Sequence, residues 1–406
     1  MSRRGIVMAA AALLMLSFTF PAAAQQSGWS VYLFDSVSQQ LLRVFLDGTQ
    51  QTYDLGIPEG SYIGQRSLDF TSDGNRVAYC VPVNTANGAN STLYIKDIAS
   101  AEALVTVELG MGDGCWATYS ADNAQVAVGI VRYYPGAPGD ADTTLPPWQL
   151  LVFDAASGQQ LHEMNPAKLA PAGLDPEPRL YMPEVRYFSN NQIIFAALPW
   201  GTEGFPISPA FFWQLGDDSV SAIDRWWRWG IDSLSSTGEL VWLEQDESIP
   251  VADPGGPTPR MNIVKLADKS GAERIIYANP DWVLIDTAFI DNGRQLAIGE
   301  LEAFDPATGD FSNQHTRWMA LNRDGSVSEL ASGLGFSRLL AAPDGYVLLS
   351  ASSNNFPATQ TLEYRSGREE TMLWQTQVEN GAFWELLWAA PTATVDGLTS
   401  FPTVTP

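Results

Sequence analysis

The residues best suited to acid–base chemistry in this chain are carboxylates that lie in short apolar segments. Asp69, Glu184 and Asp286 each lie an even number of residues before a predicted turn, as do Arg186 and Arg338. Even offsets place side chains on one face of a strand. Two acids that flank a glycosidic bond can act as acid and base, so a carbohydrate-active hydrolase or lyase is one candidate function. Ion pairs between neighbouring strands are the alternative, because two arginines share the pattern.

The sequence has few residues suited to other kinds of catalysis. The two histidines, His162 and His315, are too few for a histidine-based metal site or a serine-hydrolase triad, and no Gly-x-Ser-x-Gly motif is present. Asp305 and Asp310 offer oxygen ligands for Ca²⁺, but they lack the spacing of an EF-hand, so a plain acidic turn is the favoured interpretation. No glycine-rich phosphate loop opens a helix. We therefore expect no cofactor, no metal site and no assembled catalytic group.

Aromatic side chains supply a second candidate site, for binding instead of catalysis. The chain has 14 Trp, 13 Tyr and 18 Phe, and many of them lie in long segments that also carry Gly, Pro and acids. Trp and Tyr combine a large apolar area with a polar group, which suits contact with proteins and sugars. Packing between sheets is the alternative for any one of them. The candidate binding residues are Tyr134, Trp148, Trp200, Trp226, Trp227, Trp229, Trp282 and Trp318.

A repeat with a period near 50 residues must position these side chains. Each copy is an apolar strand, a tight turn rich in Asp, Asn and Gly, and a second apolar strand. Gly and Asn suit such turns because they accept positive φ at little cost. The six copies occupy residues 68–79, 117–128, 185–195, 232–242, 287–298 and 339–349.

Further hairpins between the copies complete units of four antiparallel strands. They occupy residues 93–109, 150–164, 262–278 and 317–331. Repeated four-stranded units with almost no helical periodicity predict an all-β fold, a single β-propeller. Residues 31–56 hold two or three strands with no preceding partner, and residues 383–390 hold a lone strand. Joining them as a composite blade removes two exposed edges. We therefore predict seven blades, with six as the alternative.

The six aligned copies resemble the WD40-like propeller repeats of the TolB family, whose core pattern is a strand, Ser-Pro-Asp-Gly or a variant, and a second strand. The last copy keeps Pro343-Asp344-Gly345. This resemblance implies a protein-binding or scaffold propeller. The propellers of prolyl oligopeptidases are similar in pattern, but those enzymes carry a hydrolase domain that we do not expect here.

The first 24 residues resemble a secretory signal peptide. Arg3 and Arg4 precede an apolar run over residues 6–20, and Ala22, Ala23 and Ala24 form a small-residue cleavage site. The run is shorter than the roughly 20 residues needed to span a bilayer, and no later segment is long enough. We therefore expect three parts, a signal peptide at 1–24, a propeller at 25–390 and a flexible Thr/Pro-rich tail at 391–406, in a secreted or periplasmic protein.

An oxidising compartment allows Cys80 and Cys115, the only two cysteines, to form a disulfide, with two buried thiols as the alternative. In a four-stranded blade, the first-to-second and third-to-fourth turns share one face, here named the turn face. The second-to-third loops and the links between blades share the other, the loop face. The repeat places both cysteines on the loop face, and this proximity favours the disulfide.

Composition and charge limit the partners. The formal charge is −24, with 22 Lys and Arg against 46 Asp and Glu, so nucleic acid and anionic membrane surfaces are disfavoured. An apolar content of 45% argues for a folded chain with a large core. The leading hypothesis is an exported, monomeric, non-enzymatic propeller that binds a protein or cell-envelope component, with a cationic partner favoured, through its aromatic and acidic loop face.

Overall fold

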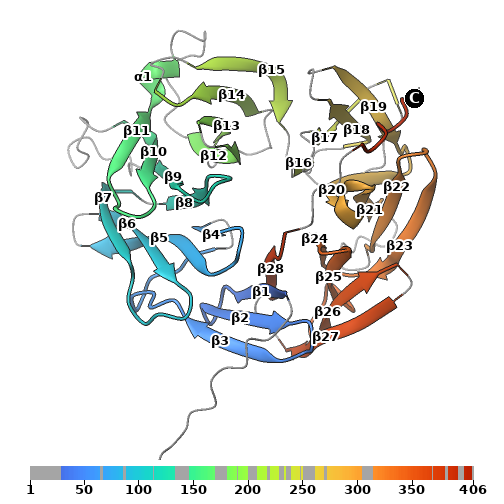
Figure 1. The fold of residues 1–406 in the computed structure, drawn as a ribbon, viewed down its shortest axis with the longest axis horizontal. Helices are drawn as coiled ribbons and strands as arrows, with labels where there is room; N and C mark the ends of the chain where they lie inside the picture. The colour runs from blue at the N-terminus through green and yellow to red at the C-terminus, as the bar shows by residue number, and fades with distance from the viewer. Residues whose placement is uncertain are drawn as a thin grey trace, which may run out of the picture.

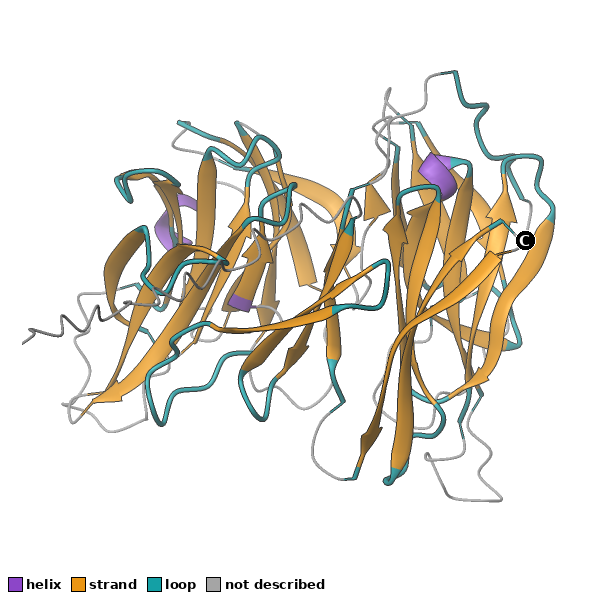
Figure 2. Ribbon diagram, turned by 60° about the horizontal axis from the view of Figure 1, so that its bottom comes forward, coloured by secondary structure: helices purple, strands orange, loops and turns teal. Residues whose placement is uncertain are grey.

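The chain folds into a ring of seven four-stranded antiparallel sheets, as Figure 1 shows. This computed structural model describes residues 29–404 except for 65–66, 86–87, 113, 133–145, 170–180, 190, 200–207, 217–219, 228–232, 235–238, 247, 250–260, 269–271, 304–313, 368, 380–382 and 392–396. Strands dominate the described chain (Figure 2), with a short helix α1 (Pro166–Leu169) and a 3₁₀ turn at Asp291–Gly293. The predicted seven-bladed propeller is confirmed.

Each blade runs from an inner strand at the axis to an outer strand at the rim. Blade 2 contains β4 (Leu68–Phe70), β5 (Arg76–Thr85), β6 (Gly88–Asp97) and β7 (Val105–Met111). Blade 3 contains β8 (Gly114–Tyr119), β9 (Gln125–Val131), β10 (Trp148–Asp154) and β11 (Gln160–Met164). Blade 4 contains β12 (Tyr181–Phe188), β13 (Gln192–Pro199), β14 (Ser208–Gln214) and β15 (Ser221–Trp227).

The second half of the ring follows the same order. Blade 5 contains β16 (Ser233–Leu234), β17 (Leu240–Glu244), β18 (Ile263–Ala267) and β19 (Glu273–Ala278). Blade 6 contains β20 (Trp282–Ile290), β21 (Gln295–Glu302), β22 (Thr316–Asn322) and β23 (Val327–Leu334). Blade 7 contains β24 (Ser337–Ala342), β25 (Gly345–Ala351), β26 (Ala358–Ser366) and β27 (Glu369–Val378).

Blade 1 is the composite blade that closes the ring. Its strands are β28 (Glu385–Ala389), β1 (Ser30–Asp35), β2 (Gln40–Phe45) and β3 (Gln50–Asp54), in that order from the axis. The last strand of the chain pairs antiparallel with the first, so that Tyr32 lies opposite Trp388. Both predicted terminal strands thereby gain partners, because an unpaired inner strand would leave its backbone groups unsatisfied.

Four of the six predicted turns, near residues 73, 122, 292 and 344, lie wholly in the described chain, and each joins the inner two strands of its blade on the turn face. Asn123 and Asp344 have φ values of 60° and 58°, the left-handed conformation that explains Asn, Asp and Gly at these positions. Turns of adjacent blades also form hydrogen bonds with each other. For example, the Ser72 N–H donates a hydrogen bond to Asn123 Oδ1 at 3.0 Å. The turn residues therefore set both the hairpin and the contact with the next blade.

The core lies between blades, where the apolar faces of adjacent sheets pack together. Among the described residues, apolar clusters join blade 1 to 2, 2 to 3, 3 to 4, 5 to 6, 6 to 7 and 7 to 1. Trp148 packs between blades 3 and 4, and Trp318 packs between blades 6 and 7. Large aromatic side chains thus fill the wedges between twisted sheets.

The C-terminal segment differs from the flexible tail that its Thr/Pro composition predicts. Residues 397–404 lie against blades 5 and 6, and Phe401 is only 2% exposed. Its ring joins the apolar cluster of these two blades. The segment has no regular secondary structure, and its buried aromatic side chain helps to hold it against the two blades.

Candidate functional site

The strand ends of blade 6 and the end of β19 bring a polar and aromatic cluster together on the loop face. β19 is followed by the link that carries Asn279, and β20 begins at Trp282. Glu300 lies near the end of β21 and is paired directly with Arg317 near the start of β22. Tyr277 completes the group, which we call the Glu300 cluster: Tyr277, Asn279, Trp282, Glu300 and Arg317.

Glu300 is the centre of this cluster because three donors converge on its carboxylate. The Tyr277 hydroxyl and the Asn279 Nδ2 each donate to Oε1 at 2.7 Å. The Arg317 Nε donates to Oε2 at 2.6 Å. The guanidinium carbon of Arg317 lies 3.9 Å from the centre of the Trp282 ring, a cation–π stack. Arg317 is therefore fixed by a carboxylate on one edge and an indole on one face.

The electrostatics of the cluster favour a charged pair. The Glu300 side chain is 0% exposed, whereas the Arg317 side chain is 24% exposed, so the cation reaches the surface and the anion does not. Burial first, and the Glu300 carboxylate second, raise the pKa of Tyr277 above its usual value, so its hydroxyl remains a donor. Among the described residues, Glu300 is the one acceptor that Arg317 engages. The guanidinium is thus oriented, and partly available to a ligand.

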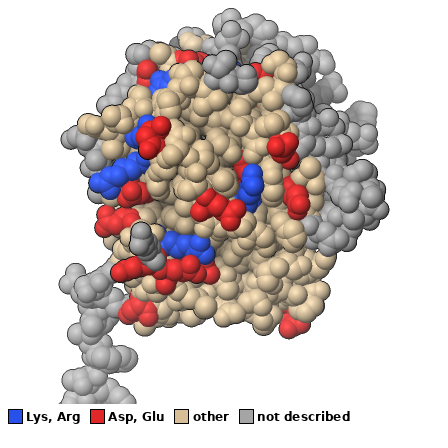
Figure 3. Space-filling view, turned by 90° about the vertical axis from the view of Figure 1, so that its right-hand side faces the viewer, with Lys and Arg blue, Asp and Glu red and all other residues tan. Residues whose placement is uncertain are grey.

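Blade 5 carries a more solvated version of the same arrangement. Lys265 Nζ lies 2.6 Å from Glu244 Oε1, and the Trp242 Nε1 donates to Glu244 Oε2 at 3.1 Å. The Glu244 side chain is 36% exposed, so this pair is solvated where Glu300 is buried. On the described part of the side shown in Figure 3, most basic groups likewise have acidic neighbours. The Glu300 cluster therefore differs from these pairs by its burial.

The candidate aromatic residues fall into four groups. Trp148 and Trp318 are 0% exposed and fill the core, which corrects the expectation that they face a ligand. Trp282 is partly exposed and belongs to the Glu300 cluster. Trp226 and Trp227 lie in β15, the outer strand of blade 4. Tyr134, Trp200 and Trp229 lie outside the described residues, as do Asp305 and Asp310.

The inner strands place the predicted carboxylates along the axis in different environments. Glu184 forms an ion pair with Arg186 at 3.2 Å. Asp69 accepts from the backbone N–H groups of Phe70 at 2.8 Å and Tyr119 at 2.7 Å. Burial raises the pKa of Asp69 to about 6, against the effect of these two bonds.

The pKa of Asp286 is raised like that of Asp69, but the groups around the two carboxylates differ. The Asp286 carboxylate accepts a hydrogen bond from the backbone N–H of Thr287 at 2.8 Å, and Asp286 is 9% exposed. Burial raises the pKa of Asp286 to about 6, while Arg338 partly opposes the shift. Burial therefore makes both aspartates bind a proton at a higher pH than an exposed aspartate does, whereas Glu184 forms an ion pair with Arg186.

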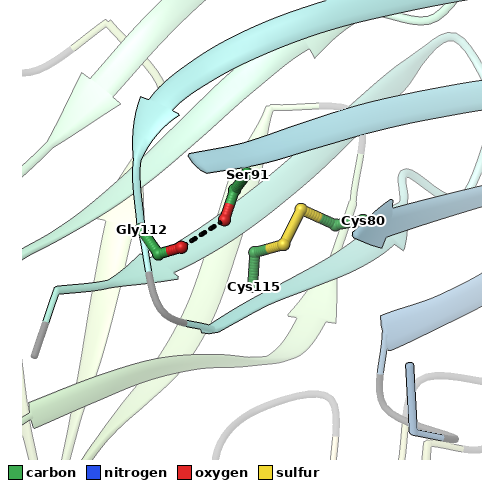
Figure 4. Close-up of a disulfide and its surroundings, with 4 residues drawn as sticks. All are labelled: Cys80, Ser91, Gly112 and Cys115. Carbon is green, nitrogen blue, oxygen red and sulfur yellow. Dashed lines mark hydrogen bonds between the residues drawn. A yellow bond between two sulfur atoms is a disulfide. The ribbon is translucent and has the colours of Figure 1, made fainter. Parts of the chain in front are cut away.

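Cys80 and Cys115 form a disulfide that joins β5 of blade 2 to β8 of blade 3 (Figure 4). Their Cα atoms are 5.7 Å apart, and both residues are buried. Both lie within strands, not just beyond the strand ends as the repeat suggests. The Ser91 hydroxyl donates to the Gly112 carbonyl at 2.9 Å beside the bond. The disulfide therefore ties two adjacent blades together in the core.

A cavity of about 530 Å³ lies on the turn face between blades 1 and 2. Its polar groups mostly bond to each other: Arg76 pairs with Asp97 at 2.8 Å, and Asp73 accepts from Thr71 and Asn75. A lining whose donors and acceptors are already paired is a weaker candidate for ligand recognition than the Glu300 cluster.

Sequence comparison gives no relative, because no known family model and no curated protein matches the chain. Neither Glu300 nor Arg317 is among the residues predicted from the sequence. The sequence signal that could have indicated them is an arginine beside a tryptophan, at residues 317–318, in a chain with few basic residues. The acid Glu300 lies near the end of the preceding predicted strand.

Structural comparison finds propellers. A prolyl endopeptidase matches with a TM-score of 0.56 and 12% identity over 87% of this chain and 51% of that chain. Prolyl oligopeptidase B from Galerina marginata matches with a TM-score of 0.54 and 10% identity, over 84% of this chain and 48% of that chain. The β-propeller domain of the Trilobed protease from Pyrococcus furiosus matches with a TM-score of 0.50 and 11% identity, over 85% of this chain and 91% of that chain. The chain spans about half the length of the two prolyl peptidases. At these identities the similarity concerns the fold, a seven-bladed β-propeller.

Proposed function

We propose that this protein is an exported, non-enzymatic propeller that binds a protein or cell-envelope partner through its loop face, with Trp282 and Arg317 as an anchor. The observation that carries the proposal is the fully buried Glu300, which accepts three hydrogen bonds and holds Arg317 at the surface. Export rests on the signal-like residues 1–24. The TolB-type resemblance supports the same scaffold role.

Energetics make recognition a better explanation of this cluster than stability alone. Desolvating a carboxylate costs several kcal/mol, about as much as a well-formed ion pair returns, so apolar residues would stabilise the same site as well or better. A guanidinium that is already oriented loses less conformational entropy when a ligand binds. The Glu300 cluster therefore has the features of a prepared contact.

The chemistry of the anchor indicates what it contacts. Trp and Arg are the residues most enriched among those that dominate binding energies. The guanidinium edge not used by Glu300 suits a carboxylate of the partner, and the indole suits an apolar side chain beside it. The acidic surface as a whole favours a partner that is cationic overall.

Affinity capture tests the proposal. The mature chain, residues 25–406, is immobilised and exposed to envelope proteins from the source cells. Trp282→Ala and Arg317→Met are compared with Met372→Ala, which removes a 59% exposed apolar side chain from β27 on the rim. Partners retained by the wild type and by Met372→Ala but lost from the two anchor variants support the proposal. The same set captured by every variant contradicts it.

A carbohydrate-active enzyme is the second candidate. Burial raises the pKa of Asp69 and Asp286 to about 6, which suits a general acid. Incubation with a panel of polysaccharides, followed by detection of new reducing ends or unsaturated products, tests this alternative. Product from the wild type that is lost in Asp286→Asn supports it, whereas no product at pH 5 to 7 contradicts it.

A further inference from the structure

The C-terminal segment lies between blades 5 and 6 on the turn face. We call the surface that it covers there the groove, and it includes Arg274, Phe289 and Arg323. Figure 1 shows the C-terminus beside β19. The Phe401 ring, 2% exposed, lies 6.4 Å from the Phe289 ring and 4.4 Å below the guanidinium of Arg323. One aromatic side chain thus anchors the segment in the core that joins the two blades.

The groove holds this segment by its main chain on both sides of the anchor. Arg323 Nη1 donates to the Thr399 carbonyl at 2.6 Å, and Arg274 Nε donates to the Phe401 carbonyl at 3.1 Å. The Val404 N–H donates to the carbonyl of Ile275 in β19, at 2.9 Å. Since β19 is the outer strand of blade 5, this last bond lies at an otherwise open sheet edge.

Arg323 is oriented before it contacts the segment. Its Nη2 and Nη1 donate to the Glu239 carboxylate at 2.6 and 3.1 Å, and its Nε donates to the Gly293 carbonyl at 2.8 Å. The side chains of Arg323 and Glu239 are each 8% exposed. Glu239 lies just before β17 and Arg323 just after β22, so blades 5 and 6 together build the clamp.

Space beside the anchor fits a proline. A Cβ atom at Gly325 would lie 2.8 Å from the Pro402 Cγ, closer than side chains can approach. Gly325 has a φ of 88°, which also favours glycine. The position after the aromatic residue therefore lies against a backbone with no side chain, which leaves room for the proline ring.

We propose that this groove is a peptide-recognition site for extended segments in which an aromatic residue is followed by proline, and that the C-terminal segment occupies it in cis. Main-chain hydrogen bonds at a sheet edge combined with one side-chain pocket are a recurring mode of peptide binding. The site is independent of the Glu300 cluster, because it lies on the opposite face. A tethered occupant has an effective concentration in the millimolar range, so the wild-type groove excludes free peptide.

The test uses the full mature chain and a labelled peptide with the sequence of residues 397–406, blocked at both ends. Phe401→Ala weakens the tethered occupant, so peptide binding measured by fluorescence anisotropy should be at least about tenfold tighter than for the wild type. A peptide with Ala in place of its Phe should bind this variant at least about tenfold more weakly. Phe401→Leu, which keeps an apolar side chain in the core, should show an intermediate affinity and serves if Phe401→Ala does not fold.

Arg323→Lys in the Phe401→Leu background tests the clamp, because lysine cannot donate to Glu239, Gly293 and Thr399 in the same fork geometry. We expect a further loss of peptide affinity of about tenfold. Two results would overturn the proposal: no saturable binding to a folded Phe401 variant, or equal binding of the native and Phe-to-Ala peptides. Either would mean that only the tether holds the segment in place.

Discussion

Arg317, at the surface, donates a 2.6 Å hydrogen bond to Glu300, which is completely buried. The pair is asymmetric, because water can replace the lost contacts of the arginine but not those of the glutamate. Tyr277 and Asn279 add two neutral donors to the same carboxylate. This asymmetry determines how substitutions of the two residues should differ.

Arg317→Met should destabilise the chain by about 3 kcal/mol, because it leaves a buried carboxylate without a counter-charge. Adding Glu300→Gln should recover part of that loss, since the double variant buries no charge. Urea unfolding of the wild type, both single variants and the double variant measures the coupling. A double variant less stable than Arg317→Met alone would show that Glu300 is not held as the charged partner of Arg317.

Loss of the disulfide should destabilise blades 2 and 3. The bond closes a loop with a sequence separation of 35 residues. The chain-entropy relation gives a contribution of about 3 to 4 kcal/mol for a loop of this length. Thermal unfolding with and without a reductant should show a lower midpoint when reduced, and Cys80→Ser should match the reduced wild type. A midpoint that the reductant leaves unchanged would contradict this expectation.

Asp286 should make stability depend on pH. Its pKa is about 6 in the folded chain against an ordinary value of 3.8, so the folded state binds more protons between these values and stability falls as pH rises through that window. Asp286→Asn removes this loss. Relative to the wild type, the variant should gain at most about 3 kcal/mol between pH 4 and pH 7.

Urea unfolding at both pH values measures that difference. Asp281→Asn, in an exposed residue of the same blade, controls for the loss of one negative charge. An Asp286→Asn variant with the same stability relative to the wild type at pH 4 and pH 7 would show that Asp286 does not titrate in this window.

Phe401→Ala should also lower stability, by about 3 kcal/mol, because truncating a buried phenylalanine leaves a cavity. Thr403→Ala, in an exposed residue of the same segment, should change it by less than about 0.5 kcal/mol. Thermal unfolding compares the two variants. Equal midpoints would mean that the C-terminal segment contributes nothing to the blade 5 and 6 interface.

The ring was predictable because its signals are local. Each inner hairpin combines apolar alternation with a turn that needs positive φ, as at Asn123 and Asp344. The composite blade followed from the strands of residues 31–56, which have no preceding partner, and from the lone strand at residues 383–390, which pairs with the first strand of the chain. Alternation and turn chemistry therefore identify the blades and their number.

The site was less predictable because its contacts join distant residues. Trp148 and Trp318 lie at or near the start of strands, yet both are buried in the apolar clusters between adjacent blades. Glu300 looks like an ordinary acid at a strand end, and only its three donors, on two other segments of the chain, reveal its role. Phe401 gives no periodic signal, and Arg274 lies 127 residues away from it.

If Trp282 and Arg317 anchor a partner on the loop face, the affinity of a captured partner must depend on them. Titration of that partner against the wild type, Trp282→Ala and Met372→Ala gives three dissociation constants. We expect Trp282→Ala to weaken binding at least about tenfold, as for a dominant contact, and Met372→Ala to leave the affinity unchanged. Equal affinity for Trp282→Ala and the wild type would contradict it.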